Sequence, residues 1–135
     1  MTAHQKQGYR HLTNKLRMLS DRFYIISAVC WTLLTVYLSL ISARSASAFN
    51  VWDFVGFDKL AHLVFYTMFS FLWCMALRKK EINFLNVLFF SISFGILMEI
   101  CQLYLFNGRS FELYDIIANI MGSIIGLILF KKFIN

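Results

Sequence analysis

The sequence predicts an all-α integral membrane protein, a four-helix bundle with both termini in the cytoplasm. Two observations predict this class. Of the 135 residues, 59% are hydrophobic and only 15% are charged, and the apolar residues gather in four stretches long enough to cross a bilayer as helices. Such a chain is too short for two ordinary domains and too apolar for a soluble one. The predicted spans cover about residues 23–43, 60–77, 82–106 and 116–130.

Residues 1–21 precede the first span as a polar, basic segment. Tyr9, Leu12, Leu16 and Leu19 recur every three or four residues, which predicts a short amphipathic helix on the inner membrane surface. We therefore divide the chain into a cytoplasmic, interfacial segment over residues 1–21 and a transmembrane domain over residues 22–135.

The first span is followed by small residues that end in Ala46-Ser47-Ala48, a pattern similar to a signal-peptidase site. A signal cleaved after Ala48 is therefore an alternative to a retained anchor. The apolar stretch and its leader are longer than those of an ordinary signal, which favours the anchor. The other three spans keep the same orientation in both cases.

Lysine and arginine gather on one side of the predicted spans: before the first span, at residues 78–80 between spans two and three, and at Lys131 and Lys132. Because such an excess marks the cytoplasmic side, both termini are expected there. Anionic lipid headgroups account for the net charge of +6. The sequence contains no nucleic-acid motif, and the short connections predict that consecutive helices are antiparallel neighbours.

Polar side chains recur at helical spacing near the outer ends of spans two, three and four. The set consists of Asp58, Lys59, His62, Tyr66, Glu99, Gln102, Arg109, Asp115 and Asn119. At about 1.5 Å of helix rise per residue, His62 lies roughly 6 Å below Asp58, and Asn119 roughly 6 Å below Asp115. Glu99 lies roughly 10 Å below Phe106 by the same measure. We expect all three to meet at one level, in the outer third of the bilayer.

An ionisable side chain inside a membrane costs about 2.5–3.5 kcal/mol on insertion scales, so a set of them in register predicts a binding site. Each member also has a structural alternative. Asp58 and Asp115 can serve as favourable charges at helix starts, and Gln102 and Asn119 can hydrogen-bond between helices. Glu99 lies between apolar neighbours and needs a proton or a partner, which His62, Arg109 or Lys59 could supply.

Small residues follow Asp115 along the fourth span. Ala118, Gly122 and Gly126 are spaced four residues apart, and this spacing predicts a face on which another helix packs closely.

The joint pattern resembles the VanZ-like family of bacterial membrane proteins over about residues 57–130. The resemblance is carried by Asp58-Lys59-x-x-His62-x-x-x-Tyr66, Glu99-x-x-Gln102, Gly108-Arg109, and Asp115-x-x-x-Asn119 with Gly122 and Gly126. The chain departs from the family at Asn107, where proline is frequent. The resemblance implies a multi-pass protein of the bacterial cytoplasmic (inner) membrane. It also implies a link to antibiotic resistance, in the form of lowered susceptibility to teicoplanin, and to envelope precursors.

We predict that the polar set forms an outward-facing pocket for an anionic or glycan-bearing lipid, a lipid-linked envelope precursor or a lipoglycopeptide. Arg109 and Lys59 would pair with phosphate or carboxylate, and Glu99, Gln102 and Asn119 would bind hydroxyls and amides. No cofactor and no nucleic-acid partner are predicted. The sequence does not determine the oligomeric state.

Other functions stay open at this point. One alternative is an intramembrane enzyme in which His62 and Glu99 act as acid and base. A second is a structural subunit in which the polar residues only hold helices together. No metal motif such as HExxH is present, although His62, Glu99 and Asp115 could together bind an ion. A channel is disfavoured because the inner halves of the spans carry no matching polar residues.

Overall fold

The computed structural model describes the backbone of residues 3–40, 56–80, 82–105 and 112–134, with side chains from Asp21 onward within these ranges, Leu105 excepted. Within them the chain forms four α-helices and no strand: α1 (Ala3–Ser39), α3 (Phe57–Leu77), α4 (Phe84–Leu105) and α5 (Leu113–Ile134). Each contains a stretch long and apolar enough to cross a membrane, over residues 21–39, 57–77, 84–104 and 113–134. The predicted all-α fold with four such helices is confirmed.

The helix boundaries differ from the predicted spans where charged residues occur. α3 begins at Phe57 and α5 at Leu113, ahead of the predicted starts at residues 60 and 116, and α5 continues to Ile134. A span predicted from hydropathy stops at the first charged residue, whereas the helix itself can continue through charged residues. Asp58 and Asp115 lie in the first turns of their helices, where a negative charge interacts favourably with the helix dipole. Residues 41–43 and Phe106 lie outside the described residues.

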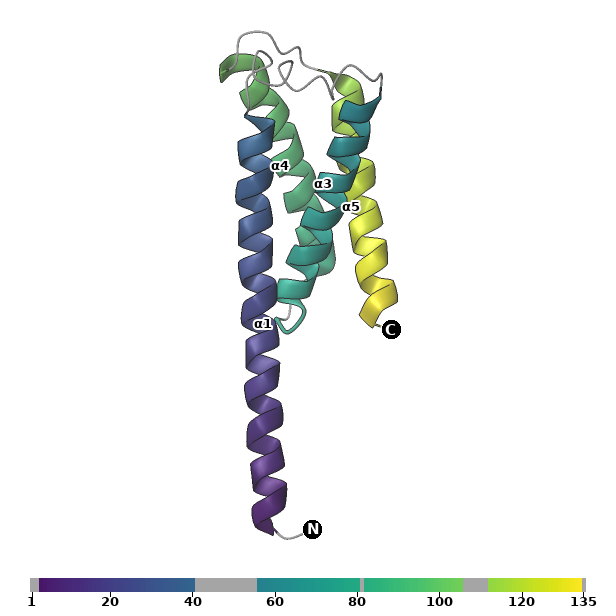
Figure 1. The fold of residues 1–135 in the computed structure, drawn as a ribbon. Coiled ribbons are helices and arrows are strands. Elements are labelled where there is room, and N and C mark those ends of the chain that lie inside the picture. Colours follow the sequence, from purple (N-terminus) through teal and green to yellow (C-terminus); the bar gives the residue numbers. More distant parts are fainter. Residues whose placement is uncertain (1–2, 41–55, 81, 106–111, 135) are drawn as a thin grey trace.

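The basic segment ahead of the first span continues the same helix. α1 runs for 37 residues without interruption, and its N-terminal half extends beyond the other three helices (Figure 1). Its apolar half is tied to α3 by two tryptophans: Trp31 Nε1 donates to the carbonyl of Phe65 (2.9 Å), and Trp73 Nε1 donates to Thr32 Oγ1 (3.1 Å).

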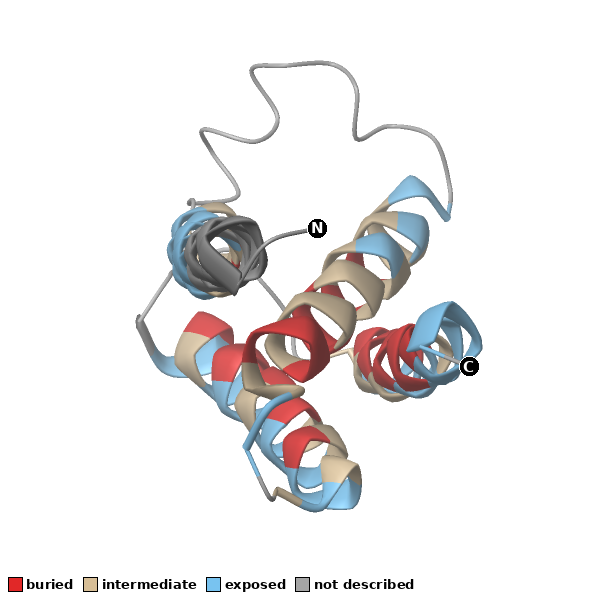
Figure 2. Ribbon diagram, turned by 90° about the horizontal axis from the view of Figure 1, so that it is seen from below, coloured by how far each residue is buried: buried red, intermediate tan, exposed pale blue. Residues whose placement is uncertain are grey.

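α3 is the central helix and packs against each of the other three. Viewed along the bundle, the buried residues line the inner faces of α3, α4 and α5 (Figure 2). Gly122 and Gly126 of α5 lie against the backbone of α3. A Cβ atom at either glycine would clash with a carbonyl oxygen, that of Leu63 or that of Thr67. The two glycines therefore allow α3 and α5 to approach more closely than larger residues would permit.

The two ends of the bundle differ in charge. Both termini and the turn after α3 lie at one end (Figure 1), where Arg78 pairs with Asp21 at 2.6 Å and Lys79 pairs with the same carboxylate. The starts of α3 and α5 and the end of α4 lie at the opposite end. The polar set that the sequence singled out belongs to that second end.

Candidate functional site

His62 lies at the centre of the polar end, buried to 9% exposure. Its Nδ1 lies 3.0 Å from Asn119 Oδ1 of α5 and 3.6 Å from Glu99 Oε1 of α4. Its Nε2 lies 3.8 Å from Asp58 Oδ1 and 4.0 Å from Asp115 Oδ2. One imidazole ring therefore connects side chains from three helices.

Helical spacing explains how these side chains meet. Asp58 and His62 are four residues apart on α3, and Asp115 and Asn119 are four apart on α5, so each pair shares a face. Gly95 then lets α4 approach. A Cβ atom at this position would lie 3.1 Å from Asn119 Cβ and 3.1 Å from Tyr66 Cε1.

Lys59 lies at the rim of the cluster and contacts three carboxylates. It pairs with Glu112, and its Nζ lies 3.5 Å from Asp115 Oδ1 and 3.8 Å from Asp58 Oδ2. The sequence-based hypothesis gave Lys59 the task of pairing with a ligand anion, but the structure engages it with the protein's own carboxylates. Glu112 was missing from the candidate set, although its position three residues before Asp115 is a signal that could have indicated it.

A chain of hydrogen bonds continues from Asn119 toward the middle of the bundle. Ser123 Oγ donates to the carbonyl of Asn119 (2.8 Å), and Ser91 Oγ of α4 lies 2.6 Å from Ser123 Oγ. Both serines are fully buried. Sequence reasoning missed them because isolated serines are common in membrane helices and carry no charge that would single them out.

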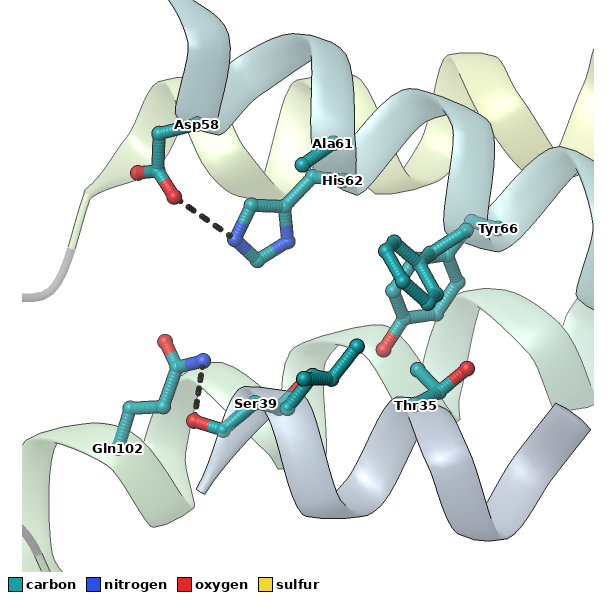
Figure 3. A pocket seen from close by; sticks show the side chains of 9 residues that line it. Thr35, Ser39, Asp58, Ala61, His62, Tyr66 and Gln102 are labelled. Atoms are coloured by element: carbon teal, nitrogen blue, oxygen red, sulfur yellow. Dashed lines mark hydrogen bonds and ion pairs between the residues drawn. The ribbon is translucent and has the colours of Figure 1, made fainter. Parts of the chain in front are cut away.

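A small cavity of about 50 Å³ opens beside His62 between α1, α3 and α4. Its polar lining comes from Thr35, Ser39, Asp58, His62, Tyr66 and Gln102 (Figure 3). Gln102 Nε2 donates to the carbonyl of Ser39 at 2.9 Å, so the end of α1 closes one side of the cavity. The part played by α1 was not predicted, because this helix contributes no acidic, basic or histidine side chain to the cavity.

Buried polar atoms next to the cavity retain hydrogen-bonding capacity. The hydroxyl of Tyr66 and Nδ2 of Asn119 have no hydrogen-bond partner within the described part of the chain, and both residues are 1% exposed. Such groups normally bond to protein, water or a ligand.

The charge of the site is acidic. In the part that the structure describes, the carboxylates of Asp58, Glu112 and Asp115 contact Lys59, and a fourth carboxylate, that of Glu99, faces His62. If all are ionised and His62 is neutral, four negative charges and one positive charge give a net charge of −3. Arg109, the predicted main anion contact, lies outside the described residues.

The side chains best placed for a cation differ from those that the sequence suggested. Asp58, His62 and Asp115 offer ligand atoms that all lie within 4.8 Å of one another. Glu99, which the sequence-based alternative included in place of Asp58, faces the other ring nitrogen of His62.

A family model described as VanZ/LLP1 matches residues 22–135. This range contains all four apolar stretches long enough to cross a membrane, apart from Asp21 at the start of the first, and every candidate site residue. No curated protein and no solved structure matches the chain.

Proposed function

The chain belongs to the VanZ/LLP1 family, and on this premise we propose that it binds the polar head of a lipid-linked envelope molecule or lipoglycopeptide beside His62. The family name is linked to teicoplanin resistance, which directs attention to ligands that join a sugar or peptide to an acyl chain. The observation that carries the proposal is the cavity between α1, α3 and α4, whose lining combines a carboxylate, an imidazole and an amide.

The charge of the site favours one part of the ligand over another. Carboxylates accept hydrogen bonds from hydroxyl and ammonium groups, and bonds to an ionised partner are the stronger ones. The described residues are predominantly acidic, which favours a sugar hydroxyl or an amine over a phosphate as the group nearest Asp58. A cavity of about 50 Å³ admits only a terminal group of this kind and leaves the rest of the head outside.

The surroundings of the cavity suit an acyl chain. Leu38 and Phe65 line it, and the exposed side chains of Leu34, Leu60 and Val64 lie on the same two helices, α1 and α3. Such apolar surface faces lipid in a multi-pass membrane protein. We therefore infer that the head enters between the helices while the acyl chain stays in the bilayer.

Photocrosslinking tests the proposal, with a lipoglycopeptide that carries a diazirine near its head. Gln102→Leu removes an amide from the cavity and should lower labelling about tenfold, the equivalent of roughly 1.4 kcal/mol for one lost hydrogen bond. Asn86→Leu removes a matched amide from an exposed position of the same helix and should leave labelling unchanged. Equal labelling of the wild type and both variants contradicts the proposal.

Location is part of the proposal. We infer a bacterial cytoplasmic membrane with both termini in the cytoplasm, because Lys131 and Lys132 are exposed at the end of α5 and excess basic residues mark that side. A reporter enzyme that works only in the cytoplasm should be active when fused after Asn135. Activity of a periplasmic reporter at the same point would reverse the assignment.

One observation favours a second candidate, an intramembrane enzyme. His62 has oxygen acceptors near both ring nitrogens, from Asn119 and Glu99 on one side and from Asp58 and Asp115 on the other. An imidazole held in this way is suited to general acid–base catalysis. Glu99→Gln should then abolish formation of a modified lipid-linked product, measured by mass spectrometry, and leave crosslinking in place. Absence of any product from the wild type removes this candidate.

A further inference from the structure

The polar end of the bundle brings together three side chains of metal-ligating type. His62 Nε2 lies 3.8 Å from Asp58 Oδ1 and 4.0 Å from Asp115 Oδ2, and all three ligand atoms lie within 4.8 Å of one another. Zn²⁺ binds imidazole nitrogen and carboxylate oxygen at about 2.0–2.2 Å. We propose that Asp58, His62 and Asp115 bind a divalent transition-metal cation of the class of Zn²⁺ and Mn²⁺.

The other ring nitrogen of His62 supplies an independent argument. Nδ1 lies 3.0 Å from the Oδ1 acceptor of Asn119, with Glu99 Oε1 at 3.6 Å. An acceptor at Nδ1 holds the ring proton there and leaves the lone pair of Nε2 directed at the carboxylates of Asp58 and Asp115. Three acceptors then face one another, an arrangement that a cation between them would stabilise. Histidines that ligate metals are commonly oriented in this way by an acceptor at the second nitrogen.

Lys59 does not occupy the same oxygens. It approaches Oδ2 of Asp58 and Oδ1 of Asp115, whereas His62 faces Oδ1 of Asp58 and Oδ2 of Asp115. Each carboxylate therefore has one oxygen near Lys59 and the other near His62, within the triad formed by Asp58, His62 and Asp115. The lysine and a metal ion can be held at the same time.

Burial adds an energetic reason. Asp115 is 4% exposed, and its Oδ1 receives no hydrogen bond from the described residues. Its contact with Lys59 is shared with Asp58 and Glu112. A buried carboxylate is costly unless it is paired or coordinates a metal, and Asp115 shares its one ammonium partner with two carboxylates that are partly exposed. A divalent cation supplies the missing positive charge.

The cavity next to the triad connects this inference with the ligand. Asp58 and His62 both line it (Figure 3), and its volume of about 50 Å³ has room for a water-sized ligand. Three protein ligands with one open position are typical of metal sites that bind a further group. The cation would bind a hydroxyl oxygen or an amine nitrogen of a lipid-linked molecule, and this last step rests on the proposed function.

Metal binding is measured on the purified full-length protein in detergent, without lipid ligand. After chelation and removal of the chelator, Zn²⁺ and Mn²⁺ are titrated in separate experiments by calorimetry, and bound metal is counted by elemental analysis. The wild type should bind about one ion of at least one of the two metals per chain and should unfold at a higher temperature once it is bound. Asp115→Asn and His62→Gln should each weaken the affinity at least tenfold.

Glu112→Gln is the matched control, because it removes a neighbouring carboxylate that contacts Lys59 but does not belong to the triad. It should weaken the affinity less than either triad variant does. Circular dichroism and gel filtration check that each variant is folded. If a triad variant fails to fold, the stoichiometry and the thermal shift of the wild type still decide the matter.

The result that would overturn the inference is a wild type that binds neither metal at millimolar concentration, with His62 serving as an imidazolium between the carboxylates. Equal loss of affinity in Glu112→Gln and Asp115→Asn would overturn it as well. Crosslinking in the presence of a chelator separates the two proposals. Metal binding without labelling contradicts only the proposed function, and labelling without metal binding contradicts only the metal site.

Discussion

His62 and Asn119 are joined through Nδ1 and Oδ1 at 3.0 Å although 57 residues separate them in the sequence. The contact connects the central helix α3 to α5 at the polar end of the bundle. It also fixes the orientation of the imidazole, so that Nδ1 faces Asn119 and Glu99 while Nε2 faces Asp58 and Asp115. The orientation of one side chain therefore determines what the whole site can bind.

Asn119 should control metal affinity without touching the metal. Asn119→Ala removes the acceptor at Nδ1, and loss of an orienting partner of this kind typically weakens metal binding about 10- to 100-fold. Asn119→Asp keeps an acceptor oxygen at the same position and should retain the affinity. Calorimetric titration of both variants checks the prediction, and equal affinity in Asn119→Ala and the wild type would contradict it.

Lys59 should oppose the binding of a cation. Its ammonium group lies 3.5 Å from Asp115 and 3.8 Å from Asp58, so it repels a second positive charge nearby. Lys59→Met should therefore raise the affinity for Zn²⁺ or Mn²⁺ several-fold. The same titration measures the effect, with Lys80→Met at the opposite, exposed end as the control. A lower affinity in Lys59→Met would show that the lysine supports the site and does not compete with the ion.

Gly122 should tolerate a larger side chain less well than Gly95 does. A methyl group there would meet the carbonyl oxygen of Leu63, which belongs to the backbone and cannot turn away. Overpacking of this kind costs about 1–3 kcal/mol, so Gly122→Ala should lower the unfolding temperature in detergent. Gly95→Ala should have a smaller effect, because its contacts at 3.1–3.3 Å are with the side chains of Asn119 and Tyr66. The reverse order would show that α3 and α5 do not pack as described.

The pair formed by Ser91 and Ser123 should stabilise the contact between α4 and α5 only modestly. Hydrogen bonds between helices in membranes average about 0.6 kcal/mol in double-mutant cycles, and the two hydroxyls lie 2.6 Å apart. Single and double substitutions by alanine, followed by unfolding, measure the coupling free energy. A coupling near zero would mean that the two hydroxyls do not bond in the membrane.

The four helices could be predicted because hydropathy depends only on the composition of each stretch of the chain. The depth of each residue followed from the known rise of a helix. Asp58 and His62 could be assigned to one face for the same reason. Their partners on other helices could not be predicted. Whether Glu99 faces Nδ1 or Nε2 of His62 depends on how α3 and α4 are rotated relative to each other, and sequence periodicity fixes rotation only within one helix.

The same limit explains the residues that were missed. The carbonyl of Ser39 meets Gln102 only because α1 ends at that level, and a backbone group has no sequence signature. Glu112 was missing from the candidate set because its pairing with Lys59 depends on the close approach of α3 and α5. Gly122 and Gly126 allow this close approach of α5 to α3, so the packing positions also hold the polar site together.

The most direct test of the account is to map where a photoreactive lipoglycopeptide attaches. Its diazirine lies near the head, and the labelled residues are identified by mass spectrometry after proteolysis. Labels are expected to concentrate at the polar end, within residues 35–39 of α1, 57–66 of α3 and 98–104 of α4. Labels spread evenly along the helices, or gathered near residues 73–90 at the basic end, would contradict the claim that the residues around His62 form the binding site.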